Sequence, residues 1–344
     1  MSKLSKPKLL IDPLPRTMEM IFTPEAQRRL NEIAELIVFQ TDRMPAEMVE
    51  KFLPETEILI GQTDLPGERL DRAPRLRAIF NVEGNFLANV DYHRCFERGI
   101  RVLIASPAFA LSVAESALGL GLDLARGISW NDRAFRSGKE TYGLDSNHGY
   151  RLFAGMKVGI IGFGDLGRTF RPLIQPFRCP VKIYDPWLPE REIRRYDAVP
   201  AGLEEVLSWA DAIFVFAGVT NENQGFLGRA ELSLIRPGGL FVLMSRAAVV
   251  DFDALTEAAK SGRVRVATDV FPDEPLDKNH PIRAVEKTVL SAHRSGGMPE
   301  AFLEIGDMVL SDLELLLRGL PPVSCKPAQP ETVSRFRGKP VAKS

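Results

Sequence analysis

Three polar residues of complementary chemistry follow successive apolar segments in the second half of this 344-residue sequence. Arg246 comes after LFVLMS, and His293 comes after TVLSA. Glu274 lies in DVFPDEP, five residues past Asp269. An arginine can hold a carboxylate through two parallel hydrogen bonds, a histidine can exchange a proton near neutral pH, and a carboxylate can orient the imidazole. Together these groups suit the reduction of a 2-keto acid, whose new alkoxide must receive a proton.

Each of the three also has a purely structural explanation. An arginine after a strand is commonly a surface charge, a glutamate before proline is commonly a turn residue, and a single histidine is more often structural than catalytic. Ligands of doubly wound folds bind at the carboxyl ends of the strands. The joint placement of Arg246, Glu274 and His293 after the last three predicted strands therefore favours a catalytic group.

A glycine-rich segment, GFGDLG, follows the apolar run KVGII and begins a predicted helix. In this context Gly162 permits a tight turn, Gly164 lets a pyrophosphate approach the backbone, and Gly167 lets helix and strand pack closely. Pro172 and Pro176 predict that the helix is short or kinked. The segment predicts a dinucleotide site.

An acid stands where a dinucleotide site requires one. Asp185 ends the segment VKIYD, 18 residues past Gly167. Its carboxylate can accept hydrogen bonds from ribose hydroxyls and repels a 2′-phosphate, so NAD is favoured over NADP. The alternative is a solvated residue that begins the turn Asp185-Pro186.

The elements around these motifs alternate between strands and helices, which indicates two α/β domains. In the first part a helix is predicted at 23–35 and strands at 8–11, 58–61, 76–81 and 102–105. Six strands are predicted in the second part, at 157–161, 181–184, 212–216, 240–244, 265–268 and 288–291. We therefore predict a doubly wound parallel-sheet (Rossmann) domain at 109–297, inserted in a smaller flavodoxin-like α/β domain. The latter comprises 1–108 and 298–344, with a helix at 301–319 and no structure assigned beyond residue 320.

The composition narrows the classes of protein to consider. The net charge is −1, so no partner nucleic acid is predicted. Cys95, Cys179 and Cys325 are far apart and form no CxxC, which argues against a metal site or a disulfide framework and fits a reducing compartment. No signal peptide is recognised, and no apolar stretch is expected to reach the ~20 residues of a membrane span. A cytoplasmic protein is expected.

The segments MSRAAVVD, DVFPDEP and SAHRSGG, which follow GFGDLG and Asp185 in this order, resemble the D-isomer-specific 2-hydroxyacid dehydrogenases. The resemblance extends over about residues 8–320. It implies an NAD-dependent interconversion of a 2-keto acid and its D-2-hydroxy acid. Arg246 would bind substrate, His293 would act as acid and base, and Glu274 would pair with His293.

The resemblance also implies further contacts. The cofactor would touch the three loop glycines together with Asp165, Leu166, Asp185, Ser245, Arg246, Asp269, His293, Ser295 and Gly296. In NVEGNFLANVD the backbone N–H groups of Asn85 and Phe86 would hold the substrate carboxylate. Phe86 stands where the family usually has glycine, and Glu83 is an acid near the expected anion, so both bear on which substrate fits.

The family implies a homodimer built largely on the cofactor domain, and the apolar helix predicted at 112–127 suits that assembly. Two alternatives stay open. One is a formate- or phosphite-type dehydrogenase of the same superfamily, although formate enzymes would be expected to carry glutamine in place of Glu274. The other is a dinucleotide-sensing protein similar to the C-terminal-binding corepressors.

Overall fold

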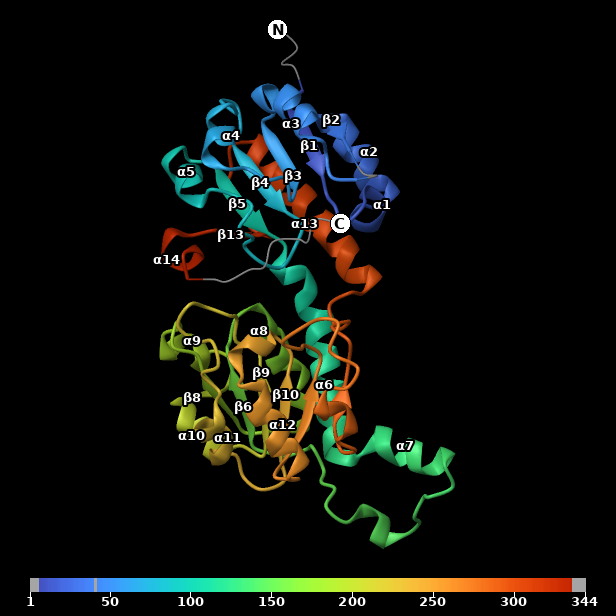
Figure 1. The fold of residues 1–344 in the computed structure, drawn as a ribbon. Coiled ribbons are helices and arrows are strands. Elements are labelled where there is room, and N and C mark those ends of the chain that lie inside the picture. The colour runs from blue at the N-terminus through green and yellow to red at the C-terminus, as the bar shows by residue number, and fades with distance from the viewer. Residues whose placement is uncertain (1–5, 40–41, 336–344) are drawn as a thin grey trace. The chain divides into compact units, whose positions relative to one another are not determined.

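The computed structural model describes residues 6–39 and 42–335, which form two compact units. We call Met1–Phe109 with Gly297–Ser344 the split domain, and Ala110–Gly296 the inserted domain. The chain passes from one to the other at 109/110 and returns at 296/297. Each domain is an α/β unit with its own sheet (Figure 1).

The inserted domain is built on a seven-stranded sheet in the order β12-β11-β10-β9-β6-β7-β8. Every neighbouring pair is parallel. This is the doubly wound dinucleotide-binding order with one added strand, so the predicted fold class is confirmed. The strands are β6 (Val158–Ile161), β7 (Val181–Tyr184), β8 (Val199–Pro200), β9 (Ala212–Val215), β10 (Gly239–Leu243), β11 (Val264–Thr268) and β12 (Val289–Leu290).

The split domain has a six-stranded sheet in the order β13-β5-β4-β3-β1-β2, in which β13 alone runs antiparallel. Its parallel part has the flavodoxin-like order, as predicted. Glu35 belongs to a strand rather than to the predicted helix, because the Glu35 amide donates to the carbonyl of Pro7 beside β1. The strands are β1 (Lys8–Asp12), β2 (Glu35–Val38), β3 (Ile58–Gly61), β4 (Ala78–Asn81), β5 (Arg101–Ile104) and β13 (Lys326–Pro327).

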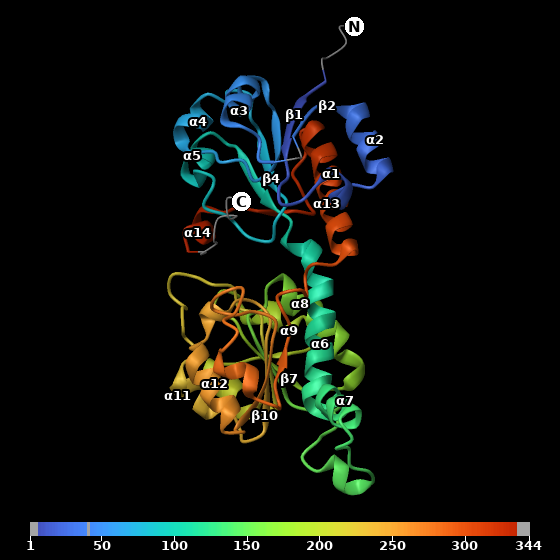
Figure 2. The ribbon, with the colours of Figure 1, turned by 45° about the vertical axis from the view of Figure 1, so that its right-hand side comes forward.

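Helices cover both faces of each sheet. In the split domain, α1, α2 and α13 lie on one side of the sheet and α3, α4 and α5 on the other (Figure 2). Leu9 and Ile11 of β1 pack with the first group of helices, and Leu10 packs with the second. This domain contains α1 (Met18–Ile21), α2 (Pro24–Ile33), α3 (Ala46–Phe52), α4 (Gly67–Asp71), α5 (Tyr92–Glu97), α13 (Pro299–Leu317) and α14 (Pro330–Val333). The inserted domain contains α6 (Ala110–Arg126), α7 (Ile128–Arg136), α8 (Asp165–Leu173), α9 (Glu190–Arg194), α10 (Leu203–Trp209), α11 (Arg229–Leu234) and α12 (Phe252–Lys260). Short 3₁₀ turns occur at Leu53–Glu55, Ser106–Phe109, Leu144–Asn147, Gln175–Phe177, Ala247–Val249 and Pro281–Ala284.

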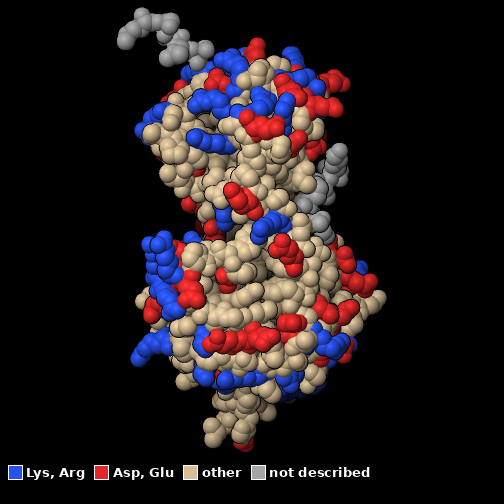
Figure 3. All heavy atoms as spheres, turned by 90° about the vertical axis from the view of Figure 1, so that its left-hand side faces the viewer, with Lys and Arg blue, Asp and Glu red and all other residues tan. Residues whose placement is uncertain are grey.

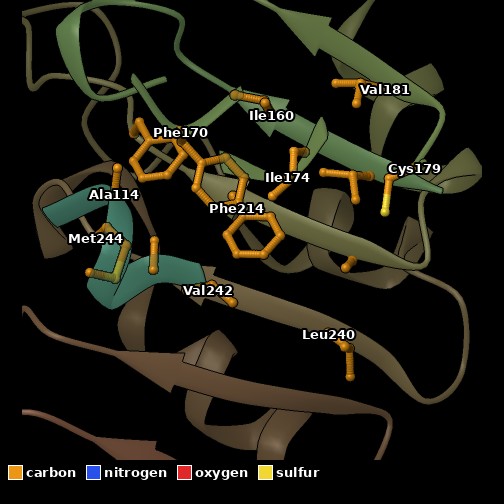
Figure 4. Packing of buried hydrophobic residues seen from close by; sticks show 14 of the residues in the cluster. Ala114, Ile160, Phe170, Ile174, Cys179, Val181, Phe214, Leu240, Val242 and Met244 are labelled. Atoms are coloured by element: carbon orange, nitrogen blue, oxygen red, sulfur yellow. The ribbon is translucent and has the colours of Figure 1, made fainter. Parts of the chain in front are cut away.

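Aromatic side chains fill the core of the inserted domain beside α6 and α8. The rings of Phe170 and Phe214 lie 4.4 Å apart, between Ile160 on one side and Val242 on the other (Figure 4). A Cβ atom added to Gly121 of α6 would lie 2.7 Å from the Phe214 ring, so α6 approaches the sheet more closely than a side chain would allow. The sheet that carries the site residues is therefore held rigidly from this face.

The helical stretch Ser106–Arg126 corrects one expectation from the sequence. It is long and apolar enough to cross a membrane, by length and composition only. The apolar composition has a structural cause within the inserted domain, because Val113, Ala117 and Leu124 are buried in its core. A core helix of this kind passes the same test as a membrane span.

The C-terminal segment is the second correction, because residues 326–327 form β13 and residues 330–333 form α14. The carboxylate of Asp312, which is fully buried in α13, accepts hydrogen bonds from the amides of Val323, Ser324 and Cys325 at 2.7–3.2 Å. These bonds hold the chain where it pairs with β5. The segment has no apolar periodicity, so its structure depends on a partner distant in sequence.

We expect Asp312→Asn to destabilise the split domain by about 2 kcal/mol, since one carboxylate oxygen becomes an NH₂ group that faces backbone donors. Asp307→Asn, an exposed position of the same helix, is the matched control and should change stability by less than about 0.5 kcal/mol. Urea unfolding followed by circular dichroism measures the difference. Tryptophan fluorescence should change little, because Trp130, Trp187 and Trp209 all lie in the inserted domain. Equal loss in both variants would contradict this role of Asp312.

Candidate functional site

The glycine-rich loop joins β6 to α8 in the inserted domain. Gly162 has φ +88°, and an added Cβ there would lie 2.4 Å from the Ala217 amide nitrogen. At Gly167 an added Cβ would lie 2.6 Å from the Gly162 carbonyl oxygen. The space next to Gly164 is open, with no atom within 4 Å of an added Cβ. Of these three glycines, Gly164 is the one with open space beside it, and it directly precedes α8. The amide groups and the helix dipole at the start of α8 favour binding of an anion there.

Helix α8 is short, as its prolines predict: it contains Pro172, ends at Leu173, and is followed by the 3₁₀ turn that includes Pro176. Its first residues are Asp165 and Leu166, both half-buried, and Leu166 packs against the core. The loop and the first turn of α8 therefore present mainly backbone groups to any ligand bound there.

Asp185 follows β7 and is tied to the glycine-rich loop. Its Oδ2 accepts a hydrogen bond from the Phe163 amide at 2.7 Å, and its Oδ1 accepts one from the Trp187 amide at 2.9 Å. Each carboxylate oxygen has a second lone pair, so the side chain can still accept from ribose hydroxyls. The acid thus fixes the loop conformation at the same position from which it could contact a ribose.

Ser245 and Arg246 follow the carboxyl end of β10. The hydroxyl of Ser245 is buried and has no hydrogen-bond partner within the protein. Arg246 is half-buried, and its Nη1 donates a hydrogen bond to the Ser245 carbonyl at 2.6 Å. This bond holds one of the terminal nitrogens of the guanidinium group. A buried hydroxyl without a partner costs free energy unless a ligand satisfies it, so Ser245 supports a polar ligand at this strand end.

His293 and Glu274 are in direct contact, although 18 residues separate them in sequence. The His293 Nδ1 lies 2.6 Å from Glu274 Oε2, and Glu274 Oε1 accepts from the Phe271 amide at 3.0 Å. Because an ionised carboxylate can only accept, Nδ1 donates this bond. The Nε2 nitrogen is then the one that can pass a proton to a substrate, and more than a third of each side chain is exposed.

Asp269 organises the loop that carries His293. It is 2% exposed and lies just beyond β11. Its Oδ1 accepts from the Ser291 hydroxyl at 2.5 Å and from the Arg294 amide at 3.1 Å, and its Oδ2 accepts from the Ser295 amide at 3.1 Å. His293 between these contacts has φ +49°, in the left-handed region that few side chains adopt. Asp269 thus has a structural role that the sequence did not indicate, in addition to the cofactor contact that is expected of it.

Two serines join the same loop to the first helix of the inserted domain. The hydroxyls of Ser116 in α6 and Ser295 lie 2.7 Å apart, and Ser295 is 6% exposed. Gly296 follows at the point where the chain leaves the inserted domain. Ser116 gave no signal as a site residue in the sequence, because no motif connects it to Ser295.

The expected substrate loop lies in the split domain after β4. Phe86 is 7% exposed and its ring packs edge-on against Tyr92, 6.1 Å away, and burial raises the pKa of the Tyr92 hydroxyl. The bulky side chain is therefore turned into the domain, while Asn85 is half-buried. Glu83 pairs with Arg16, whose Nη2 lies 3.1 Å from its Oε1. Arg16 was not among the residues that the sequence singled out.

These observations are consistent with a dinucleotide bound at the carboxyl edge of the sheet in the inserted domain. The open space at Gly164, the N-terminus of α8 and the unpartnered hydroxyl of Ser245 all suit such a ligand. The described residues include no cluster of three or more histidine, cysteine or acidic side chains that could hold a metal ion.

Comparison with known proteins places this geometry in a family. Residues 118–295 match the family described as D-isomer specific 2-hydroxyacid dehydrogenase, NAD binding domain. The solved structure of a phosphoglycerate oxidoreductase from Rhizobium etli is 44% identical, with a TM-score of 0.86 over 95% of this chain and 100% of that one.

Curated relatives have two kinds of name. A D-3-phosphoglycerate dehydrogenase of Mycobacterium tuberculosis is 31% identical over 78% of this chain and 50% of its own length. That of Archaeoglobus fulgidus is 28% identical over 81% and 53%. The chain thus spans about half the length of these relatives. A glyoxylate reductase of Pyrococcus furiosus is 28% identical over 85% of this chain and 89% of its own length.

The match extends over the glycine-rich loop, Asp185, Arg246, Asp269, Glu274 and His293, all of which lie within residues 118–295. The cofactor of the inserted domain is NAD. The chain belongs to the D-isomer-specific 2-hydroxyacid dehydrogenase family, and its inserted domain is the NAD-binding domain of that family.

Proposed function

We propose that this protein interconverts a small 2-keto acid and its D-2-hydroxy acid, with NAD(H) as the hydride carrier. The proposal depends mainly on the 2.6 Å hydrogen bond between His293 and Glu274. These two residues follow β12 and β11, and Arg246 follows the adjacent strand β10. An imidazole held by a carboxylate, with an arginine at the same edge of the sheet, would supply a proton donor and an anion-binding group.

The roles of the three residues follow from their chemistry. Arg246 would bind the substrate carboxylate through its guanidinium, which the Ser245 carbonyl holds at one nitrogen. NADH, when bound, supplies the hydride. His293 would give its Nε2 proton to the oxygen of the substrate as negative charge develops there, and in the reverse direction it would take that proton back. Glu274 would orient the ring and stabilise its charged form.

The remaining cofactor contacts and the preference for NAD over NADP are part of the proposal. Support for the preference comes from Asp185, whose carboxylate stands beside the glycine-rich loop and would repel a 2′-phosphate. If NADPH were accepted, Arg194 and Arg195 at the end of α9 would be the residues that could bind the 2′-phosphate; both form exposed ion pairs, with Glu190 and Glu192.

A homodimer, formed through the arm that α7 and residues 137–152 make on the inserted domain, is also proposed (Figure 1). The arm is anchored at its base, where Arg265 donates to the carbonyls of Leu124 and Gly149. Its outer part exposes large apolar side chains, which would be buried against a second copy. These are Ile128, Phe135, Tyr142, Leu144 and Leu152, between 59% and 84% exposed.

A reducing compartment, as in the cytoplasm, would suit the three cysteines, all of which are buried free thiols. Burial raises the pKa of the Cys95 thiol to about 12, so this group stays protonated and unreactive in the folded protein.

Turnover tests the proposed reaction directly. We expect NADH-dependent reduction of at least one member of a 2-keto acid panel, with NADPH a poorer donor, and no oxidation of formate or phosphite with NAD. Arg246→Lys should lower kcat/KM for the keto acid at least about tenfold, because lysine keeps the charge but loses the two-pronged contact. Arg236→Lys, near the amino end of the same strand, is the control and should behave as the wild type. NADH binding without turnover of any panel member would instead favour a dinucleotide-sensing role.

The His293–Glu274 pair predicts opposite pH effects in the two reaction directions. Glu274→Gln preserves size but removes the charge that stabilises protonated His293. Reduction, which needs the protonated ring, should therefore fail at a lower pH than in the wild type. Oxidation of the hydroxy acid, which needs the neutral ring, should begin its rise at a lower pH. Full pH profiles of kcat/KM in both directions measure the shift, with Glu257→Gln on the surface of α12 as control; superimposable reductive profiles would refute the pairing.

The proposed dimer predicts a defined response to a charge on the arm. Wild-type protein should have twice the 38.2 kDa mass of one chain by light scattering. Leu144→Asp should lower the dimer affinity at least about tenfold, because it would bury an unpaired carboxylate. Val199→Asp, at an exposed position of the same domain outside the arm, should leave the dimer intact. A monomeric wild type, or equal dissociation of both variants, would refute the arm as the interface.

A further inference from the structure

An ion pair stands beside the expected substrate loop of the split domain. Arg16 follows β1, and Glu83 follows β4, so both lie at the carboxyl edge of the sheet. Arg16 Nη2 lies 3.1 Å from Glu83 Oε1 and 3.3 Å from Glu83 Oε2. About one fifth of each side chain is exposed, so the pair is screened less by solvent than a surface pair.

Arg16 is held in place from more than one side. Its guanidinium carbon lies 4.5 Å from the centre of the Phe302 ring, and the Phe302 and Phe109 rings meet edge to face at 6.5 Å. The Nε of Arg16 is buried without an acceptor, and among the described residues Glu83 is the carboxylate that forms an ion pair with this cation. The backbone of Glu83 is fixed as well, because its amide donates to Asn81 Oδ1 and its carbonyl accepts from the Ala105 amide, each at 3.0 Å.

The second arginine at the carboxyl edge of this sheet is also paired with a carboxylate. Arg43, which follows β2, has Nη1 3.6 Å from the buried Asp12 Oδ2. In the described segments 12–17, 42–45, 61–66 and 81–87 the charged side chains are Asp12, Arg16, Asp42, Arg43, Asp64 and Glu83. Both arginines are thus matched by carboxylates, and Asp42 and Asp64 add exposed negative charge. Figure 3 also shows basic and acidic side chains mixed over one face of this domain.

We propose that the substrate is a monoanionic 2-keto acid, whose side chain carries no second negative charge, and that Glu83 enforces this choice by neutralising Arg16. The inference rests on the proposed function. The single carboxylate of such a substrate would be held at this edge by the backbone N–H groups of Asn85 and Phe86. A phosphate or second carboxylate at the same edge would meet arginines that carboxylates already compensate, together with the exposed acids Asp42 and Asp64. A phosphorylated substrate would need a free cation at this edge. The chain therefore differs in substrate from relatives that are named for a phosphorylated hydroxy acid.

The test compares kcat/KM, with NADH, for two kinds of keto acid. Pyruvate and 2-ketobutyrate are monoanionic, and oxaloacetate and 3-phosphohydroxypyruvate carry at least one further negative charge. In the wild type we expect the ratio of multiply charged to monoanionic kcat/KM to be below about one tenth. Glu83→Gln exposes the charge of Arg16 and should raise this ratio at least about tenfold. The double variant Glu83→Gln with Arg16→Met should return it toward the wild-type value, since the exposed cation is gone.

A matched control separates the charge effect from a general disturbance of the domain. Glu57 lies just before the amino end of β3, is 20% exposed at its side chain, and pairs with Arg75 at 3.5 Å and with Arg77 at 3.6 Å. Glu57→Gln removes a carboxylate of similar exposure, with its ion pairs, from the opposite edge of the same sheet and should leave the ratio unchanged. Thermal unfolding of each variant establishes that it is folded.

The outcomes are distinct. A wild type that prefers a multiply charged keto acid overturns this inference and leaves the proposed function standing, whereas no turnover of any keto acid removes both. An unchanged ratio in Glu83→Gln, or an equally raised ratio in the double variant, also overturns it. Salt gives a second measurement that needs no variant: added salt screens repulsion, so the wild-type ratio should rise with ionic strength, and a fall would contradict the proposal.

Discussion

The carboxylate of Asp269 is the contact on which the geometry of the site depends. His293 adopts a left-handed backbone conformation, which a side chain other than glycine takes only where its surroundings enforce it. Asp269 provides that enforcement with bonds to the residues on either side, and it does so from a buried position at the end of β11. The backbone that carries the imidazole is therefore fixed without a ligand, and Glu274 then orients the ring through its hydrogen bond to Nδ1. The order of dependence runs from the sheet to Asp269, from Asp269 to the loop, and from the loop to the imidazole of His293.

The positions of the candidate site residues could be predicted from sequence, because these residues follow strands with clear apolar runs. The segments before Gly162, Arg246 and His293 each end at the same edge of a parallel sheet, and that topology brings them together without further information. The glycine pattern was equally readable, since the close approaches at Gly162 and Gly167 tolerate no side chain.

Other features could not be predicted, and each for a physical reason. Strands β8 and β13 contain two residues apiece, too few to show any periodicity. The bond between Ser116 and Ser295 joins residues 179 positions apart, and neither lies in a pattern that refers to the other. The pairing of Arg16 with Glu83 depends on the turn after β1 and on the order of strands between them. Side-chain contacts of this kind follow from tertiary structure, so a single sequence carries little trace of them.

The insertion of one domain within the other sets an order of assembly. All seven strands of the NAD-binding sheet lie between the two crossings, so its core is complete once residue 296 has been synthesised. The split domain at that stage lacks α13, which contributes Ile305, Val309 and Leu313 to its core, and it lacks the edge strand that Asp312 secures. Domains generally fold as units during synthesis, from the N-terminal side. We therefore expect the NAD-binding domain to fold first, although it is encoded later, and the core of the N-terminal 109 residues to be completed only when α13 has been synthesised.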